Sequence, residues 1–278
     1  MTNPIEVKRT AKLFINGAFP RSESGRSYPV SGANGEFLAN VANATRKDAR
    51  DAVVAAAAAQ PKWAAATAYN RGQILYRMAE MLQGRSAQFV EELKAAGVKN
   101  PADQVTEAID RIIWYSGWSD KLAMTNGSAN PVAGPYFNFS IPEPTGVIAI
   151  VVAEQPPLLA IVDQICAAIV SGNTVVALAP QSAPLVAVSF AEVLATSDLP
   201  AGVVNLLTCD SDEIATWLAS HLEVDGIDLS GVTDANFKTK LESEAAINLK
   251  RVLRDFNDGY QAMKTWLEIK TVWHPQGF

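Results

Sequence analysis

The sequence predicts an α/β fold built on a doubly wound parallel sheet, and three observations predict it. Val147–Val152 is a short apolar run rich in β-branched residues, which is typical of a buried strand. An apolar segment of helical length, Leu158–Val170, follows it, and a second buried strand, Thr174–Leu178, comes next. A strand, helix and strand of this kind normally lie inside a parallel sheet that is covered on both faces. Ligands of such sheets bind at the carboxyl ends of the strands, here residues 153–155 and 179–181.

The first 125 residues predict a short strand followed by helices. Leu13–Gly17 is apolar and ends in an Asn-Gly pair, which indicates a strand and a tight turn. Residues 22–35 are rich in Ser and Gly and predict a loop with a hairpin. Thr45 and Asp48 resemble a capping box, so a helix is expected to begin there. Further helices are expected over residues 67–83, 85–96 and 102–122.

The second half of the chain predicts two more strands of the main sheet, over residues 203–207 and 226–229. From residue 237 to residue 264 the sequence is charged and is expected to be mostly helical. The apolar residues of this segment fall on one stripe, formed by Leu241, Ala245, Leu249, Val252, Leu253 and Phe256. Two other segments, 136–140 and 266–273, alternate in polarity and predict strands outside the main sheet.

Composition excludes several classes of function. The chain has 278 residues, of which 49% are hydrophobic, and its net charge of −6 argues against nucleic acid or an anionic membrane as a partner. No apolar run is long enough to span a bilayer, and the amino terminus lacks a hydrophobic signal region, so a cytoplasmic protein is expected. Two cysteines give no disulfide framework, and no His, Cys and Asp residues cluster with metal-ligand spacing.

Several motifs with fixed spacing give the chain a family resemblance. Pro144–Val147, Gly172–Val176, Pro184–Leu185 and Leu199–Asn205 follow one another in the order found in the cofactor half of the aldehyde dehydrogenase superfamily. The resemblance extends back to Leu13–Gly17 and covers nearly the whole chain. It implies a Rossmann-like cofactor domain, a hairpin used in oligomer contacts, and a final strand that pairs with a neighbouring subunit.

The same resemblance predicts how the chain is divided. Residues 1–125 and 143–264 are expected to form the cofactor-type domain, and residues 126–142 and 265–278 the oligomerisation hairpin and tail. Family members are longer by about a catalytic domain, so this chain resembles a truncated member in which that domain is replaced by a helical connection. It looks like the shortened, degenerate second module of family-16 aldehyde dehydrogenases.

The residues that perform the family's chemistry are missing from the matching places. Members use a cysteine nucleophile in a Gly-Gln-x-Cys type segment and a glutamate base, and neither motif occurs here. Cys166 falls in the middle of an apolar helix and is expected to be inert. Cys209 follows a strand, so it has room to be exposed at the carboxyl edge and is the one alternative nucleophile. We expect no catalytic residue.

The family's cofactor contacts also look degenerate. They match a vestigial set of positions in this sequence: Glu154, Gln155, Leu178, Gln181, Cys209, Ser211, Gly231 and Val232. Glu154 places a negative charge near where the pyrophosphate would lie, and two unit charges ~4 Å apart would repel by ~4 kcal/mol at an effective dielectric of about 20. Leu178 offers no hydrogen-bond donor to the ribose, and Val232 replaces a serine. We therefore expect no bound cofactor, and NAD only if the site still functions.

These observations favour a non-catalytic aldehyde dehydrogenase-like subunit with a structural role in oligomerisation or docking. The expected partner is a second copy or a full-length active aldehyde dehydrogenase, contacted through Tyr136, Phe137, Phe139, Ile269, Val272 and Trp273. Two alternatives stay open. One is an NAD-dependent aldehyde oxidoreductase that is active only with a partner, and the other is a module that binds NAD as a sensor.

Overall fold

The computed structural model describes residues 10–209 and 211–277, the side chain of Ser211 excepted, and it has the predicted α/β architecture. Five parallel strands form the central sheet, in the order β10-β9-β6-β7-β8. Their bounds are β6 (Val147–Val151), β7 (Thr174–Leu178), β8 (Val204–Leu207), β9 (Gly226–Asp228) and β10 (Arg251–Leu253). The chain starts at β6, moves outward to β8, and then returns to the other side of β6. The strand order therefore reverses between β6 and β9, and this is where a crevice forms in such sheets.

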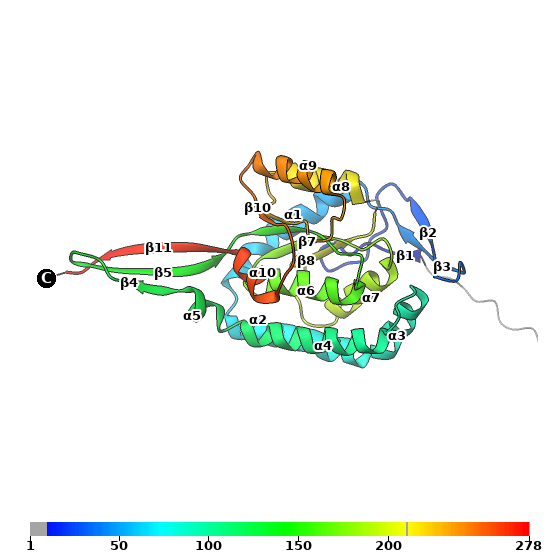
Figure 1. Cartoon of the computed structure of the whole chain (residues 1–278), viewed down its shortest axis with the longest axis horizontal. Coiled ribbons are helices and arrows are strands. Elements are labelled where there is room, and N and C mark those ends of the chain that lie inside the picture. The colour runs from blue at the N-terminus through cyan, green and yellow to red at the C-terminus, as the bar shows by residue number, and fades with distance from the viewer. Residues whose placement is uncertain (1–9, 210, 278) are drawn as a thin grey trace, which may run out of the picture.

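Helices cover both faces of this sheet (Figure 1). One face carries α1 (Arg46–Ala65), α8 (Ser211–Ser220) and α9 (Ala235–Ala246). The other face carries α6 (Pro157–Ile169), α7 (Pro184–Ala195) and α10 (Gly259–Thr265). A further layer outside α6 and α7 consists of α2 (Ala68–Gly84), α3 (Ser86–Ala95) and α4 (Pro101–Trp118).

The strand sequences explain this layering. In β6, Ile148 and Ile150 pack toward α6, whereas Val147 and Ala149 pack toward α1. Both faces of the strand are buried, which is why its sequence is apolar throughout instead of alternating. The predicted stop after α6 is confirmed, because Gly172 has a φ of +101°, a conformation that favours glycine.

The amino-terminal segment forms a small sheet beside the end of β8. Its strands are β1 (Thr10–Ala11), β3 (Phe37–Ala42) and β2 (Ser27–Ser31), with β2 and β3 paired as the predicted hairpin. The Thr208 hydroxyl donates to the Ala42 carbonyl at 2.6 Å, and the Ala44 N–H donates to the Thr208 carbonyl at 2.9 Å. The capping box of α1 is also present, formed by Thr45 and Asp48. These bonds hold the start of α1 against the carboxyl edge of the main sheet.

The segment 237–264 is helical at its two ends, in α9 and α10, but the single helical stripe predicted for it is interrupted. Helix α9 ends at Ala246, Leu249 takes a φ of +58° with 89% of its surface exposed, and β10 then joins the main sheet as its edge strand. The apolar spacing suited one helical stripe, but Val252 is spaced equally well for a short edge strand beside β9. Periodicity does not separate these two possibilities for short apolar runs.

A three-stranded antiparallel sheet projects from the body as an arm (Figure 1). It consists of β4 (Ser128–Asn130), β5 (Tyr136–Pro144) and β11 (Leu267–Pro275), in the order β11-β5-β4, with the short α5 (Leu122–Asn126) at its base. On one side, the final strand pairs with β5 of its own chain over all nine residues. The expected pairing with a neighbouring subunit concerns its other side and stays a prediction. The register with β5 sets Val272 opposite Phe139 and Trp273 opposite Asn138.

Candidate functional site

A cavity of about 350 Å³ lies at the point where the strand order reverses. Its polar lining includes Gln155, which follows β6, together with Gln164 of α6 and Ser230, which follows β9. Pro156, Leu159 and Phe256 supply apolar walls. Of the predicted cofactor positions, Gln155 lines this cavity, and the sequence analysis did not single out the other polar residues.

Asp228, at the carboxyl end of β9, is fully buried behind this cavity. Its Oδ1 accepts bonds from the Ser230 N–H at 2.9 Å and from the Ser230 hydroxyl at 2.5 Å. The Gln164 Nε2 donates to that same hydroxyl at 2.9 Å, while the Oδ2 of Asp228 has no partner among the described atoms. Burial raises the pKa of Asp228 to about 6, because the charged form is poorly solvated there. The sequence held one sign of this buried carboxylate, because Asp228 falls within the predicted strand 226–229, where an acidic residue is unusual.

A second carboxylate, Asp163 of α6, also lines this cavity. Its Oδ1 accepts bonds from the Tyr115 hydroxyl at 3.0 Å and from the Arg111 guanidinium at 3.2 Å. Burial raises the pKa of Asp163, although the positive charge of Arg111 opposes the shift. Both partners belong to α4, so this carboxylate ties α4 to α6 and has a structural use.

A second cavity, of about 580 Å³, lies beyond the carboxyl ends of β7 and β8. Residues of β2 and the loops after β7 and β8 line it, among them Tyr28, Gln181, Ser182 and Cys209. Cys209 was predicted to have room to be exposed, but only 3% of its surface is accessible, because it belongs to the apolar cluster between the sheet and α1 and α8. The pKa of Tyr28 is raised well above its ordinary value, mainly by burial and also by the nearby Cys209 and Glu154.

Glu154 joins the loops that follow β6 and β7. Its carboxylate accepts the Gln181 N–H at 2.9 Å and the Ser182 N–H at 2.8 Å, and the Ser182 hydroxyl donates to the Glu154 carbonyl at 3.1 Å. Unpaired backbone N–H groups in such a loop, just before a helix, are the usual receptors for an anionic ligand. Here the chain's own carboxylate already occupies these donors.

The remaining predicted positions are apolar or closely packed. Leu178 and Val232 are buried in the core between the sheet and α1, α8 and α9. A Cβ at Gly231 would lie 2.3 Å from the Val151 carbonyl oxygen, so this glycine is required by its close approach to β6. Helix α8 begins at Ser211, whose side chain lies outside the described residues. The structure thus brings Glu154, Gln181 and Cys209 together and leaves Leu178 and Val232 in the core.

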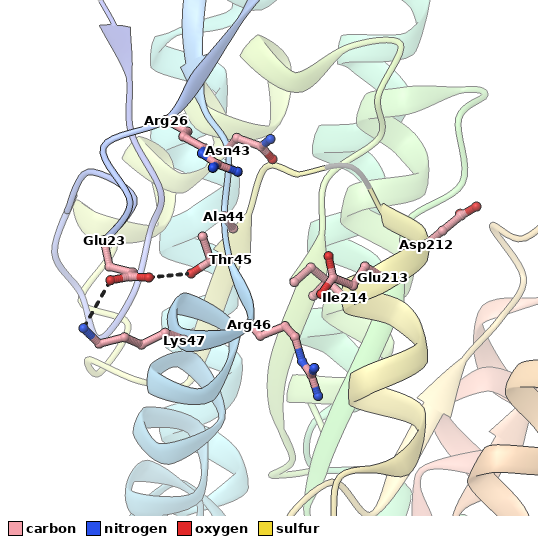
Figure 2. A pocket seen from close by; sticks show the side chains of 10 residues that line it. All are labelled: Glu23, Arg26, Asn43, Ala44, Thr45, Arg46, Lys47, Asp212, Glu213 and Ile214. Atoms are coloured by element: carbon pink, nitrogen blue, oxygen red, sulfur yellow. Dashed lines mark hydrogen bonds and ion pairs between the residues drawn. The ribbon is translucent and has the colours of Figure 1, made fainter.

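A third cavity, of about 700 Å³, opens between the amino-terminal ends of α1 and α8 (Figure 2). On the α1 side, the Glu23 carboxylate accepts the Lys47 ammonium at 3.2 Å and the Thr45 hydroxyl at 3.4 Å. On the α8 side, Asp212 and Glu213 occupy the first turn of the helix. Two carboxylates already complement the positive end of the α8 dipole, which makes this end less receptive to an anionic ligand.

The described part of the chain carries neither a membrane-spanning helix nor a cluster of metal-binding side chains. Among residues 10–209 and 211–277, no helix is long and apolar enough to cross a membrane. The same residues contain no group of three or more His, Cys, Asp and Glu side chains arranged to hold a metal ion.

Comparison with known proteins gives a consistent result. The aldehyde dehydrogenase family profile matches residues 20–256. Retinal dehydrogenase 2 of Gallus gallus is 34% identical over 259 residues, which cover 89% of this chain and 48% of that protein. This chain therefore spans about half the length of the curated relatives it matches.

Solved structures agree with the sequence relatives. A salicylaldehyde dehydrogenase from Pseudomonas putida G7 superimposes with a TM-score of 0.82 at 25% identity, over 88% of this chain and 51% of that one. An NAD⁺ complex of an aldehyde dehydrogenase from Bacillus cereus gives a TM-score of 0.82 at 23% identity, over 88% and 50% of the two chains. The predicted superfamily and fold are thereby confirmed, and the chain belongs to the aldehyde dehydrogenase family.

Proposed function

We propose that this chain is a non-catalytic aldehyde dehydrogenase-like module that joins its body to another protein subunit through the arm. The observation that carries the proposal is the arm itself, a sheet that projects from the body with large apolar side chains exposed. Its exposed members are Tyr136, Phe137, Ile141, Ile269 and Trp273, and Phe139 and Val272 lie between them at half-buried positions.

Both faces of the arm carry such residues. Opposed residues of antiparallel strands share a face, so Phe139 and Val272 lie on one face of the arm and Ile269 and Trp273 on the other. Soluble proteins seldom expose so many neighbouring apolar side chains unless a partner covers them. A protein subunit that binds the arm would remove this apolar surface from water.

The residues at the carboxyl edge of the main sheet support a non-catalytic role. Cys166 is fully buried, and burial raises the pKa of its thiol; Cys209 is buried as well, so neither thiol is placed as an accessible nucleophile. A bound dinucleotide would have to displace the Glu154 carboxylate from the backbone N–H groups of Gln181 and Ser182. Leu178 and Val232 offer it no hydrogen-bonding side chain. The residues present do not fit NAD.

Two other functions are tested alongside this one. The aldehyde dehydrogenase from Bacillus cereus that shares this fold was solved as an NAD⁺ complex, so an NAD-binding sensor is a coherent second candidate. An oxidoreductase completed by catalytic residues of a partner is the third. Calorimetric titration of NAD into the purified chain, with an aldehyde oxidation assay on the same sample, separates them. We expect neither heat of binding nor turnover; binding would support the sensor, and turnover would support the oxidoreductase.

Docking is tested by placing charge on the arm. Changing Ile269→Lys together with Val272→Lys is expected to abolish association with any other subunit, because both faces of β11 then carry a charge that the interface must desolvate. Leu222→Lys is the matched control, since Leu222 is a leucine of the body with 76% of its surface exposed. Association is measured by analytical ultracentrifugation of the chain, alone and with a full-length aldehyde dehydrogenase. Association that survives the double change would contradict the docking role.

A further inference from the structure

The cavity of about 350 Å³ at the strand reversal has negative charge in its walls and no positive charge to balance it. Carboxylate, amide and hydroxyl side chains form its polar lining, and no lysine, arginine or histidine is among the described residues that line it. The remaining walls are apolar and include Pro156, Leu159 and Phe256. A ligand that complements such a lining carries N–H donors, a positive charge and a short hydrocarbon part.

Asp163 presents one carboxylate oxygen to this cavity. The residue lines the cavity although only 8% of its surface is exposed. Its Oδ1 accepts the bonds from Tyr115 and Arg111, whereas its Oδ2 has no hydrogen-bond donor among residues 10–209 and 211–277. A carboxylate oxygen that is largely removed from water and has no donor is poorly solvated, so it attracts a ligand that brings an N–H group.

The guanidinium of Arg111 does not neutralise this wall of the cavity. It lies 3.2 Å from the Asp163 carboxylate and 3.4 Å from the Glu107 carboxylate, so one cation is shared between two anions. One negative charge is therefore left over. Charges interact more strongly where water is partly excluded, so a cation inside the cavity would be stabilised by this excess.

Asp228 adds a second negative charge behind the same cavity. Its Oδ1 accepts the N–H and the hydroxyl of Ser230, a lining residue, while its Oδ2 is buried without a partner in the described chain. With a pKa of about 6, this carboxyl group is mostly ionised at pH 7.5. The Lys238 ammonium acts on Asp228 through space, but it is paired with the Asp255 carboxylate at 3.3 Å. A cation bound in front of Ser230 would partly neutralise the buried charge.

We propose that this cavity binds a small primary amine in its ammonium form. The nitrogen donates to the Asp163 Oδ2 on the Ser230 side of the cavity, and the hydrocarbon chain lies along Leu159 and Phe256. A volume of about 350 Å³ is near the lower end of the range for small-molecule sites, so the ligand has few carbon atoms. The amine site is independent of the docking role, because no described residue of β4, β5 or β11 lines the cavity.

The class of ligand is tested by calorimetric titration at pH 7.5 with n-butylamine. 1-Butanol is the neutral counterpart of similar size, and butyrate carries a negative charge in place of the positive one. We expect butylamine to bind at least about tenfold more tightly than either, because hydrogen bonds between charged partners are roughly twice as strong as those between neutral ones.

Two variants of the cavity test where the amine binds. Asp163→Asn removes the charge but keeps an oxygen that can accept the Tyr115 hydroxyl, and it should weaken butylamine binding at least about tenfold. Leu159→Trp fills the cavity without changing any charge, so the heat of binding should disappear. Asp225→Asn is the matched control, since Asp225 accepts the Val147 N–H at 2.8 Å at the amino edge of the sheet. Its dissociation constant should change by less than about twofold.

Thermal denaturation without ligand checks that each variant is folded. If Asp163→Asn does not fold, Leu159→Trp decides, because Leu159 is only half-buried and a larger side chain there extends into the cavity. Binding of 1-butanol or butyrate as tightly as butylamine would overturn the ligand class. Undiminished butylamine binding by the folded cavity variants would overturn the site.

Discussion

The body and the arm use the same strand chemistry but bury it differently. In the body, α6 and α7 cover one face of the sheet and α1 and α8 the other, so Phe190 of α7 is fully buried. In the arm, the short α5 packs against β5 at the base, and farther out 49% of Phe137 is exposed. The comparison teaches that a β-sheet does not create a core by itself. It must be covered by another layer. In the body, helices of the same chain form this layer, whereas in the arm, as we propose, a second molecule supplies it.

The comparison is tested most strongly by removing one phenylalanine from each region. Phe190→Ala is expected to lower the free energy of unfolding by about 3–5 kcal/mol, because it leaves a cavity in a closely packed core. Phe137→Ala should cost less than about 1 kcal/mol in the monomer, since half of that ring is already in water. Urea denaturation of dilute samples measures both values. Similar losses for the two variants would mean that the arm has a core of its own.

The buried carboxylate of the body gives the next largest effect. Because the pKa of Asp228 is about 6 in the folded protein, the folded state keeps its proton at pH values where the unfolded chain has lost it. Its contribution to stability is therefore complete below about pH 4 and is lost as pH rises through 6, by about 3 kcal/mol in all. About 2 kcal/mol of this change falls between pH 4.5 and 7.5.

Asp228→Asn removes this titration, so the variant should gain about 2 kcal/mol relative to the unmodified chain between pH 4.5 and 7.5. Urea denaturation at the two pH values measures it. Asp255→Asn is the control, because Asp255 lines the same cavity but is exposed. Parallel pH profiles for the Asp228 variant and the unmodified chain would show that the carboxylate is not buried in solution.

The smallest expected effect concerns the loop contact at the carboxyl edge. Glu154→Ala removes the acceptor for two backbone N–H groups and should lower stability by about 1 kcal/mol, since the site is partly open to water. Glu154→Gln keeps one acceptor oxygen and should lose less. Thermal denaturation of the two variants tests the order. A Glu154→Ala protein as stable as the unmodified chain would show that the carboxylate does not hold the loops.

The sequence by itself determined the parallel sheet and most of its helices. Val147–Val152, Leu158–Val170 and Thr174–Leu178 can bury themselves in few other ways, and Gly172 and the Thr45–Asp48 pair fix helix ends through local backbone chemistry. Local signals of this kind act over a few residues and are readable without tertiary contacts. The alternation of polar and apolar residues in the two arm strands is also a local signal, so it predicted the strands themselves. It did not predict which strand each of them pairs with.

Only the tertiary structure decided how distant segments meet. It placed Val252 in an edge strand instead of a helix, because the open side of β9 offers backbone partners that no local pattern records. It paired β11 with β5, and it buried Cys209 in the apolar cluster between the sheet and α1 and α8. It also brought Glu154 onto the N–H groups of Gln181 and Ser182, 27 and 28 residues further along the chain. Burial and hydrogen-bond partners are properties of the assembled layers, so such sites emerge only once the sheet and its covering helices are in place.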